Sequence, residues 1–191
     1  MTARPALILV AGGPGAGKTS LGRELARRLQ SAVLLDKDVI ASPWVDAMLD
    51  RLNNGQVDRD SAVYWETVRP LEYRALLAAA LDNLAIGKSV VAVAPFGPEL
   101  RDPGWIEARR QSLSASGARL AIVWIATDSP VAHERMVARN DARDRWKLAH
   151  WHEFTASDRF SAAPGVDLVL HNGAGSRIGD LVDRVIEHLN T

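Results

Sequence analysis

The chain has 191 residues, 23 Lys and Arg against 23 Asp and Glu, and no cysteine. This length predicts one domain, residues 1–191, with a substantial core. Without cysteine there are no disulfides or thiolate chemistry, and zero net charge argues against a nucleic-acid-binding protein, which usually carries a basic excess. No apolar run is long enough for a membrane span, and the N-terminus leads straight into a strand pattern. We therefore expect a cytoplasmic protein without a signal peptide.

The first predicted elements are a buried strand, a glycine-rich loop and a helix. Residues 6–10 (ALILV) are a short apolar run typical of a parallel strand. Residues 12–19 (GGPGAGKT) fit G-x-x-x-x-G-K-[ST], the phosphate-binding P-loop. Leu21, Leu25 and Leu29 then recur every fourth residue, which predicts a helix with one apolar face. This order of elements is the context that a P-loop requires.

The residue types of the P-loop explain how it holds a triphosphate. Its glycines allow a tight turn in which backbone N–H groups point at phosphate oxygens, and the following helix adds its positive N-terminal end. We expect Lys18 to reach the β- and γ-phosphates and the Thr19 hydroxyl to bind Mg²⁺. The expected ligands are therefore ATP and Mg²⁺, although the motif does not distinguish ATP from GTP. The expected nucleotide-binding residues are Gly12, Gly13, Pro14, Gly15, Ala16, Gly17, Lys18, Thr19 and Ser20.

The second strand is expected at residues 32–35, and Asp36-Lys37-Asp38 follows it. A helix is then expected to begin after Ser42, with Pro43 in its first turn. Residues 58–60, which are charged, are predicted to form an exposed loop.

The rest of the chain continues the alternation of strands and helices. A helical region is predicted from 61 to 86, with a break or kink at Pro70, and residues 95–98 are predicted to be a rigid loop. The remaining strands are expected at 89–94, 119–126 and 167–170, and the helices after them near Asp102, Asp128 and Ser176. This pattern predicts an α/β fold with a parallel sheet and helices on both faces. Ligands of such sheets bind beyond the carboxyl ends of the strands.

The arginine-rich stretch after the fourth strand is a candidate lid at about residues 128–160. Arg135 and Arg139 are four residues apart and share one helix face, and Arg143 follows. Because guanidinium groups can hold phosphoryl oxygens bidentately, we expect Arg139 and Arg143 to clamp the γ-phosphoryl group, with Arg135 as the next nucleotide contact. The alternative is a solvated helix whose arginines pair with nearby carboxylates.

Residues 64–73 (YWETVRPLEY) combine aromatic and charged side chains between the second and third strands. The expected substrate-binding residues, polar groups and apolar walls together, are Arg69, Glu72, Tyr73, Trp44, Trp65 and Phe96. The alternative is an i,i+3 ion pair between Arg69 and Glu72, with the aromatic rings in the core. His150 and His152 resemble a metal pair, but without further ligands at a fitting spacing we expect lid packing or surface positions.

The P-loop, Asp36-Lys37-Asp38 and the arginine-rich stretch occur in an order that resembles the small P-loop kinases. The pattern is most similar to the group of chloramphenicol phosphotransferase, the zeta toxins and the 5′-hydroxyl kinase domain of polynucleotide kinase. The resemblance implies a P-loop NTPase fold with a five-stranded parallel sheet of order 2-3-1-4-5 and a short helical lid. It also implies transfer of the γ-phosphoryl group of ATP to a hydroxyl.

The resemblance further implies roles for the two carboxylates. Lys37-Asp38 matches the basic–acidic pair of the family motif, which makes Asp38 the first candidate for the general base. Asp36 is the second candidate, or holds Mg²⁺ together with Thr19, because the third strand carries no Asp. The alternative is that both carboxylates are turn residues that cap the next helix. Relatives often have a basic residue where this chain has Ala41, so one substrate or phosphate contact is expected to be lost or relocated.

The leading hypothesis is an ATP-dependent kinase for a hydroxyl of a small molecule, such as a nucleoside, a sugar or an antibiotic. The first alternative is a nucleotide-binding regulatory or toxin-like module that acts through a partner. The second is a polynucleotide 5′-hydroxyl kinase, against which the balanced charge counts. A small-molecule acceptor is thus expected as the partner, without nucleic acid or membrane, and the acceptor's identity and the oligomeric state stay open.

Overall fold

The computed structural model describes residues 4–156 and 160–190. Its centre is a five-stranded sheet of order β2-β3-β1-β4-β5, in which every neighbouring pair of strands is parallel. The strands are β1 (Ala6–Gly12), β2 (Val33–Asp36), β3 (Val90–Val93), β4 (Arg119–Ala126) and β5 (Leu168–His171). The predicted P-loop NTPase fold with the strand order 2-3-1-4-5 is therefore confirmed.

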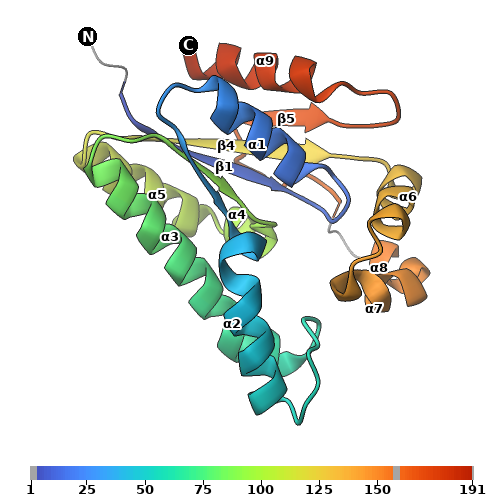
Figure 1. Ribbon diagram of the computed structural model, residues 1–191. Coiled ribbons are helices and arrows are strands. Elements are labelled where there is room, and N and C mark those ends of the chain that lie inside the picture. Colours follow the sequence, from blue (N-terminus) through green and yellow to red (C-terminus); the bar gives the residue numbers. More distant parts are fainter. Residues whose placement is uncertain (1–3, 157–159, 191) are drawn as a thin grey trace.

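Helices cover both faces of the sheet (Figure 1). α1 (Lys18–Arg28) and α9 (Ile178–Asn190) lie on one face, whereas α3 (Arg69–Ala85) and α5 (Pro103–Ala115) lie on the other. Since both faces are covered, the strands bury side chains on both sides and read as continuous apolar runs.

The core is divided by the sheet into two apolar layers. Ile8 and Val10 of β1 pack on the side of α1 and α9, and Leu7 and Leu9 pack on the side of α3 and α5. Because successive strand residues point to opposite faces, one strand contributes to both layers. The sheet is thereby fixed on both sides, and its carboxyl edge is a rigid base for the loops that leave it.

A third apolar cluster lies away from the sheet, between α2 (Lys37–Leu52) and the π-helical turn η1 (Tyr64–Val68) that precedes α3. In Figure 1, α2 and α3 extend side by side beyond the sheet. Pro70 is at the start of α3, as the predicted break requires. We call α2, η1 and α3 together the helical arm. The cluster holds this arm next to the carboxyl edge of the sheet, where ligands of this fold class bind.

Two local predictions are wrong. α2 begins at Lys37, immediately after β2, rather than after Ser42, and Pro43 is inside the helix. The reason is that the Asp36 side chain accepts a hydrogen bond from the Asp38 amide at 3.0 Å and caps the helix at once. The expected rigid loop at 95–98 is in part the short helix α4 (Gly97–Arg101).

The expected lid at about 128–160 corresponds to four short elements at the carboxyl edge of the sheet: α6 (Ser129–Arg139), η2 (Ala142–Asp144), α7 (Arg145–Ala149) and α8 (Trp151–Ala156). We call residues 129–156 the lid; residues 157–159 of the predicted stretch lie outside the described part. Within the described ranges, no helix combines the length and apolar character needed to cross a membrane.

Candidate active site

The P-loop connects β1 to α1 at the carboxyl edge of the sheet. Gly15 and Gly17 have φ angles of 70° and 94°, a conformation that side-chain-bearing residues rarely adopt. The Gly15 carbonyl accepts a hydrogen bond from Arg135 at 3.3 Å, and the Ala16 carbonyl accepts one from Asn172 Nδ2 at 2.7 Å. These carbonyl groups are therefore satisfied by the protein, which suits a loop whose amides bind phosphate oxygens.

Lys18 precedes Thr19 in the motif, and its ammonium group lies against the P-loop. Its Nζ donates to the Gly13 carbonyl at 2.8 Å. Burial lowers the pKa of Lys18 to about 8; Asp38 acts in the opposite direction, and the positive charges of Arg139 and Arg143 lower it further. The neighbouring carboxylates offset only part of the cost of the buried Lys18 charge, so an anionic ligand beside it would be favourable.

Thr19 and Asp36, the predicted metal-binding residues, are in direct contact. The Thr19 hydroxyl donates to Asp36 Oδ2 at 2.9 Å, and Asp36 is only 7% exposed. A hydroxyl and a carboxylate side by side fit Mg²⁺, which takes oxygen ligands and keeps several waters. The described residues contain no group of three or more His, Asp or Glu that could hold a metal. His150, one of the two histidines that resemble a metal pair, stacks on Trp146 with ring centroids 4.8 Å apart.

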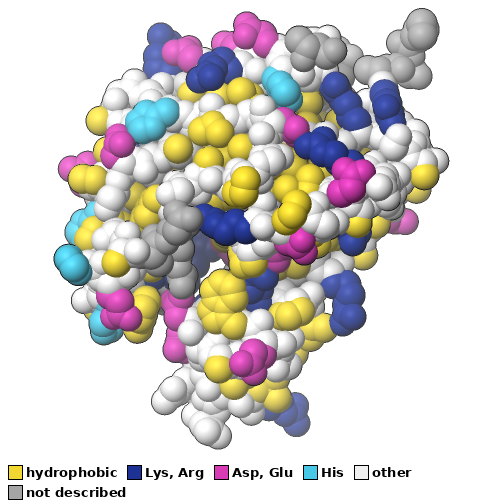
Figure 2. Space-filling view, turned by 180° about the vertical axis from the view of Figure 1, so that it is seen from behind, with side chains coloured by type: hydrophobic (Ala, Val, Ile, Leu, Met, Phe, Trp, Pro, Cys, Tyr) yellow, Lys and Arg dark blue, Asp and Glu magenta, His cyan; other side chains and the backbone are white. Residues whose placement is uncertain are grey.

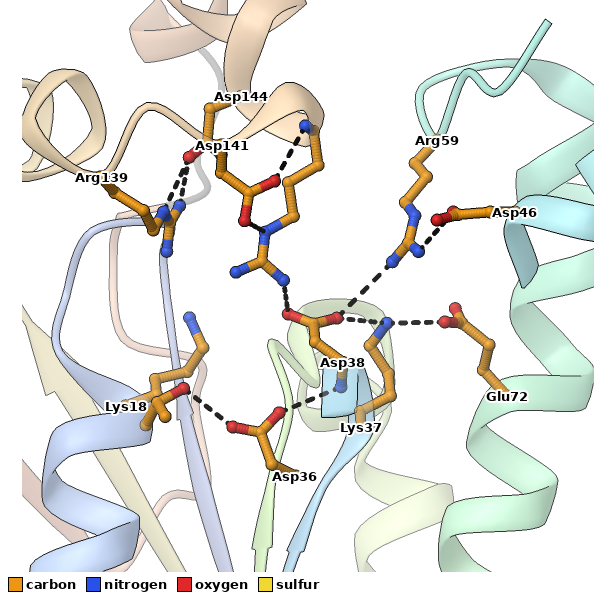
Figure 3. Close-up of polar contacts among 12 residues, drawn as sticks. Lys18, Asp36, Lys37, Asp38, Asp46, Arg59, Glu72, Arg139, Asp141 and Asp144 are labelled. Carbon is orange, nitrogen blue, oxygen red and sulfur yellow. Dashed lines mark hydrogen bonds and ion pairs between the residues drawn. The ribbon is translucent and has the colours of Figure 1, made fainter. Parts of the chain in front are cut away.

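Asp38 is at the centre of the polar network in Figure 3. Its Oδ1 lies 3.0 Å from Lys37 Nζ and 3.8 Å from Arg59 Nη1, and its Oδ2 accepts a hydrogen bond from Arg143. Burial alone would raise the pKa of Asp38, but Lys37 and Arg143 outweigh it and lower the pKa to about 2. The carboxylate is therefore ionised at neutral pH, and it faces the cleft.

Glu72, a predicted substrate-binding residue, is buried behind the cleft and is not among the residues that line it. It is 1% exposed, accepts from Lys37 Nζ at 2.9 Å and accepts from the Tyr64 hydroxyl at 2.7 Å. Burial, together with the neighbouring Glu72 carboxylate, raises the pKa of Tyr64, so the hydroxyl stays protonated and donates. Glu72 thus fixes Lys37, which in turn contacts Asp38.

Arg69 and two of the predicted aromatic residues do line the cleft. Arg69 pairs with Glu99 through two hydrogen bonds of 2.7 and 2.8 Å, and its guanidinium lies over the rings of Tyr73 (4.1 Å) and Trp65 (5.0 Å). Arg69 therefore pairs with Glu99 and not with Glu72, the partner in the alternative interpretation of the sequence. The Arg69 side chain is held in place by contacts on both sides.

The other two predicted apolar walls do not line the described cleft. Phe96 is fully buried and packs in the core against Tyr73, with ring centroids 5.4 Å apart. Its φ angle of 52° turns the chain after β3 so that the ring points into the protein. Trp44 packs against the apolar cluster between α2 and η1.

The three lid arginines line the cleft, and two of them, Arg139 and Arg143, also pair with carboxylates. Arg139 Nε donates to Asp144 at 2.9 Å, and Arg143 Nε lies 3.1 Å from Asp141. Arg135 contacts the Asn172 carbonyl at 3.0 Å in addition to the P-loop. The pairs with Asp144 and Asp141 fix the direction of the Arg139 and Arg143 guanidinium groups.

The cleft that these groups line has a volume of about 880 Å³ and lies between the P-loop, the helical arm and the lid. Figure 2 shows the molecule hollowed between the arm and the main body, with Lys and Arg side chains at the hollow. This volume is ample for a nucleotide and a small second substrate.

Several lining residues had no predicted role in the site: Lys37, Arg59, Lys147 and Asn172. Arg59 is in the stretch that was predicted to be an exposed loop, yet it pairs with Asp46 at 2.7 Å and approaches Asp38. Asn172 directly follows β5, at a strand end where ligands of this fold class are expected to bind. No local signal marks Arg59, because it lies in a turn and its partners, Asp38 and Asp46, belong to α2.

Comparison with known proteins places this geometry in a family. A family model described as an AAA domain matches residues 7–160. The chain belongs to this AAA domain family. The search of curated protein sequences found no match to it.

Solved structures of small kinases share the fold of this AAA domain protein. A candidate kinase from Chloroflexus aurantiacus is 24% identical with a TM-score of 0.65, over 97% of this chain and 98% of that one. The APS kinase of Mycobacterium tuberculosis in complex with AMPPNP and APS is 20% identical with a TM-score of 0.62, over 99% of both chains. Shikimate kinase from Bacteroides thetaiotaomicron is 20% identical with a TM-score of 0.57, over 99% of this chain and 100% of that one.

At these identities the comparison establishes the fold, which is that of the small P-loop kinases. The narrower resemblance to chloramphenicol phosphotransferase, the zeta toxins and polynucleotide kinase stays a prediction.

Proposed function

We propose that this AAA domain protein is an ATP-dependent kinase that transfers the γ-phosphoryl group to a hydroxyl of a small molecule. One observation carries the proposal: an ionised carboxylate, Asp38, faces the same cleft as Lys18 of the P-loop. Phosphoryl transfer needs a triphosphate cradle and a base for the acceptor on either side of the transferred group. The fold and the kinases that share it support the same reaction class.

In the proposed reaction the acceptor oxygen attacks the γ-phosphorus. The bond between that phosphorus and the β,γ-bridging oxygen breaks, ADP leaves, and the acceptor proton passes to Asp38. Lys18 binds the phosphate oxygens, and Arg139, fixed by Asp144, stabilises the charge that develops on them. Mg²⁺, when held by Thr19 and Asp36, would neutralise phosphate charge.

The proposed acceptor site is the part of the cleft next to Asp38, between the helical arm and the lid. Trp65, Arg69 and Tyr73 line it from the arm, and Lys147 lines it from the lid. Rings and polar groups together suit a compact hydroxyl compound such as a nucleoside, a sugar or an antibiotic. We propose ATP as the donor because a solved structure with this fold holds AMPPNP.

The test is a screen for acceptor-dependent ADP formation from ATP and Mg²⁺ against nucleosides, sugars, aminoglycosides and phenicols. The Lys18→Ala variant is the blank, and we expect at least one acceptor class to be turned over by the wild type alone. Asp38→Ala should lose transfer while its thermal unfolding stays cooperative. ATP binding without turnover of any acceptor would contradict the kinase and favour a regulatory module, and full activity of Asp38→Ala would contradict the base.

A further inference from the structure

Arg143 links the lid to the proposed base. Its Nη1 donates to Asp38 Oδ2, and its Nε lies 3.1 Å from Asp141 within the lid. Lys37 engages the other oxygen of Asp38 at 3.0 Å. Both carboxylate oxygens of Asp38 are therefore occupied by cationic groups, although the side chain is 37% exposed.

An Asp38 carboxylate in this state is badly placed to accept a proton from an acceptor. Lys37 is also held by the buried Glu72 at 2.9 Å, so its contact with Oδ1 belongs to the framework of the arm. The contact with Oδ2 differs, because Arg143 comes from the lid and lines the cleft that also contains Lys18 and Arg139. Oδ2 is thus the oxygen that becomes available if Arg143 moves.

A γ-phosphate is a competing partner for the Arg143 guanidinium. Arginine binds carboxylates and phosphates through the same fork of N–H donors, and the phosphate carries more charge than Asp38. Arg139 has no such competition with Asp38, since its carboxylate partner, Asp144, is buried inside the lid itself. A triphosphate in the P-loop should therefore change the partner of Arg143 and leave the Arg139–Asp144 pair in place.

We propose that Arg143 exchanges Asp38 for the γ-phosphate, so that Oδ2 of Asp38 is open to an acceptor hydroxyl only when a triphosphate is bound. This inference rests on the proposed function, in which Asp38 is the base. It makes Arg143 a determinant of specificity for ATP over ADP. It also sets an order, in which the nucleotide binds before the acceptor, because the acceptor's base is blocked until then.

The exchange is tested by binding alone, without an acceptor. Dissociation constants of Mg·AMPPNP and Mg·ADP are measured by calorimetry for the wild type, Asp38→Asn, Arg143→Ala and the double variant. We expect Arg143→Ala to weaken AMPPNP about tenfold or more, the scale of a charge-assisted hydrogen bond, and ADP less than about twofold. Asp38→Asn should tighten AMPPNP about threefold or more in the wild-type background, because Arg143 is then free of its competitor.

The double variant decides between exchange and simple charge repulsion. If Arg143 mediates the effect, Asp38→Asn should leave AMPPNP affinity unchanged in the Arg143→Ala background. Equal tightening in both backgrounds, or weaker AMPPNP binding by Asp38→Asn in the wild-type background, would overturn the exchange. Arg145→Ala, which removes an exposed lid cation, is the matched control and should leave both affinities unchanged. No AMPPNP binding by the wild type would overturn the proposed function itself, and the exchange with it.

Discussion

Thr19 donates to Asp36 across 2.9 Å and so joins the P-loop to the end of β2. The same Asp36 carboxylate caps α2 by accepting a hydrogen bond from the Asp38 amide. One side chain therefore connects the P-loop, the proposed metal-binding position and the helix that carries the proposed base.

Replacing Asp36 should affect stability and metal use together. Asp36→Ala removes the cap of α2, at a cost of about 1 kcal/mol in the free energy of unfolding, and it removes the carboxylate proposed for Mg²⁺. Urea unfolding and AMPPNP binding with and without Mg²⁺ measure the two effects. Asp102→Ala is the control, since Asp102 caps α5 through the Gly104 amide at 2.9 Å and does not line the cleft. It should match the loss of stability and keep the full Mg²⁺ effect; wild-type Mg²⁺ dependence in Asp36→Ala would contradict the metal assignment.

ATP affinity should fall as the pH rises above about 8. In the free protein the pKa of Lys18 is lowered to about 8, and a bound triphosphate must raise it. Binding therefore takes up a proton above pH 8, and the dissociation constant should rise by up to about tenfold per pH unit there. Below pH 7, Lys18 is protonated in both states and contributes no slope. Calorimetry in buffers of different ionisation enthalpy measures the uptake, which should vanish in Lys18→Ala; equal uptake in that variant would assign the proton to another group.

Removing the Glu72 carboxylate should destabilise the protein severely. Glu72→Ala removes one hydrogen-bond acceptor from the buried Lys37 ammonium and one from the Tyr64 hydroxyl. Breaking a buried ion pair from one side costs about 3 kcal/mol or more, and urea unfolding measures this loss. Glu107→Ala on the exposed face of α5 should change stability by less than about 0.5 kcal/mol. A Glu72→Ala variant of wild-type stability that lost only acceptor affinity would restore the original substrate-binding prediction.

Gly15 should tolerate no side chain, because the lid helix lies against it. A Cβ on Gly15 would come within 2.7 Å of the Ala132 carbonyl oxygen, and its φ angle is 70°. Gly117 has a similar φ of 74° and open space around it, which makes Gly117→Ala the matched control. Both variants should lose about 1 kcal/mol or more through backbone strain, but only Gly15→Ala should weaken AMPPNP by about tenfold or more. Equal AMPPNP affinity of the two variants would show that the lid contact does not position the P-loop.

The sheet and the P-loop could be predicted because their signals are local. A parallel strand buried on both faces reads as an apolar run, and β4 accordingly lies in the stretch 119–126 that was predicted to contain a strand. The strand order is not local, and it followed from the resemblance carried by the P-loop, Asp36-Lys37-Asp38 and the lid arginines.

The acceptor side of the cleft was predicted poorly because its contacts join distant parts of the chain. Glu72 pairs with Lys37, which is 35 residues away in the sequence, and no local pattern indicates this contact. Phe96 has a left-handed backbone that turns its ring into the core, and a single sequence does not reveal this. The start of α2 was missed because the Ser42-Pro43 signal competed with Asp36, whose capping contact comes first in the chain.

The Ala16 carbonyl is held by Asn172, and 156 positions of sequence separate the two residues. One brace of the glycine motif near the start of the chain is thus supplied by a residue that follows the last strand. A truncation ending before β5 would retain every letter of the motif and lack this brace, so fragment studies of nucleotide affinity need the carboxyl-terminal strand and its following turn.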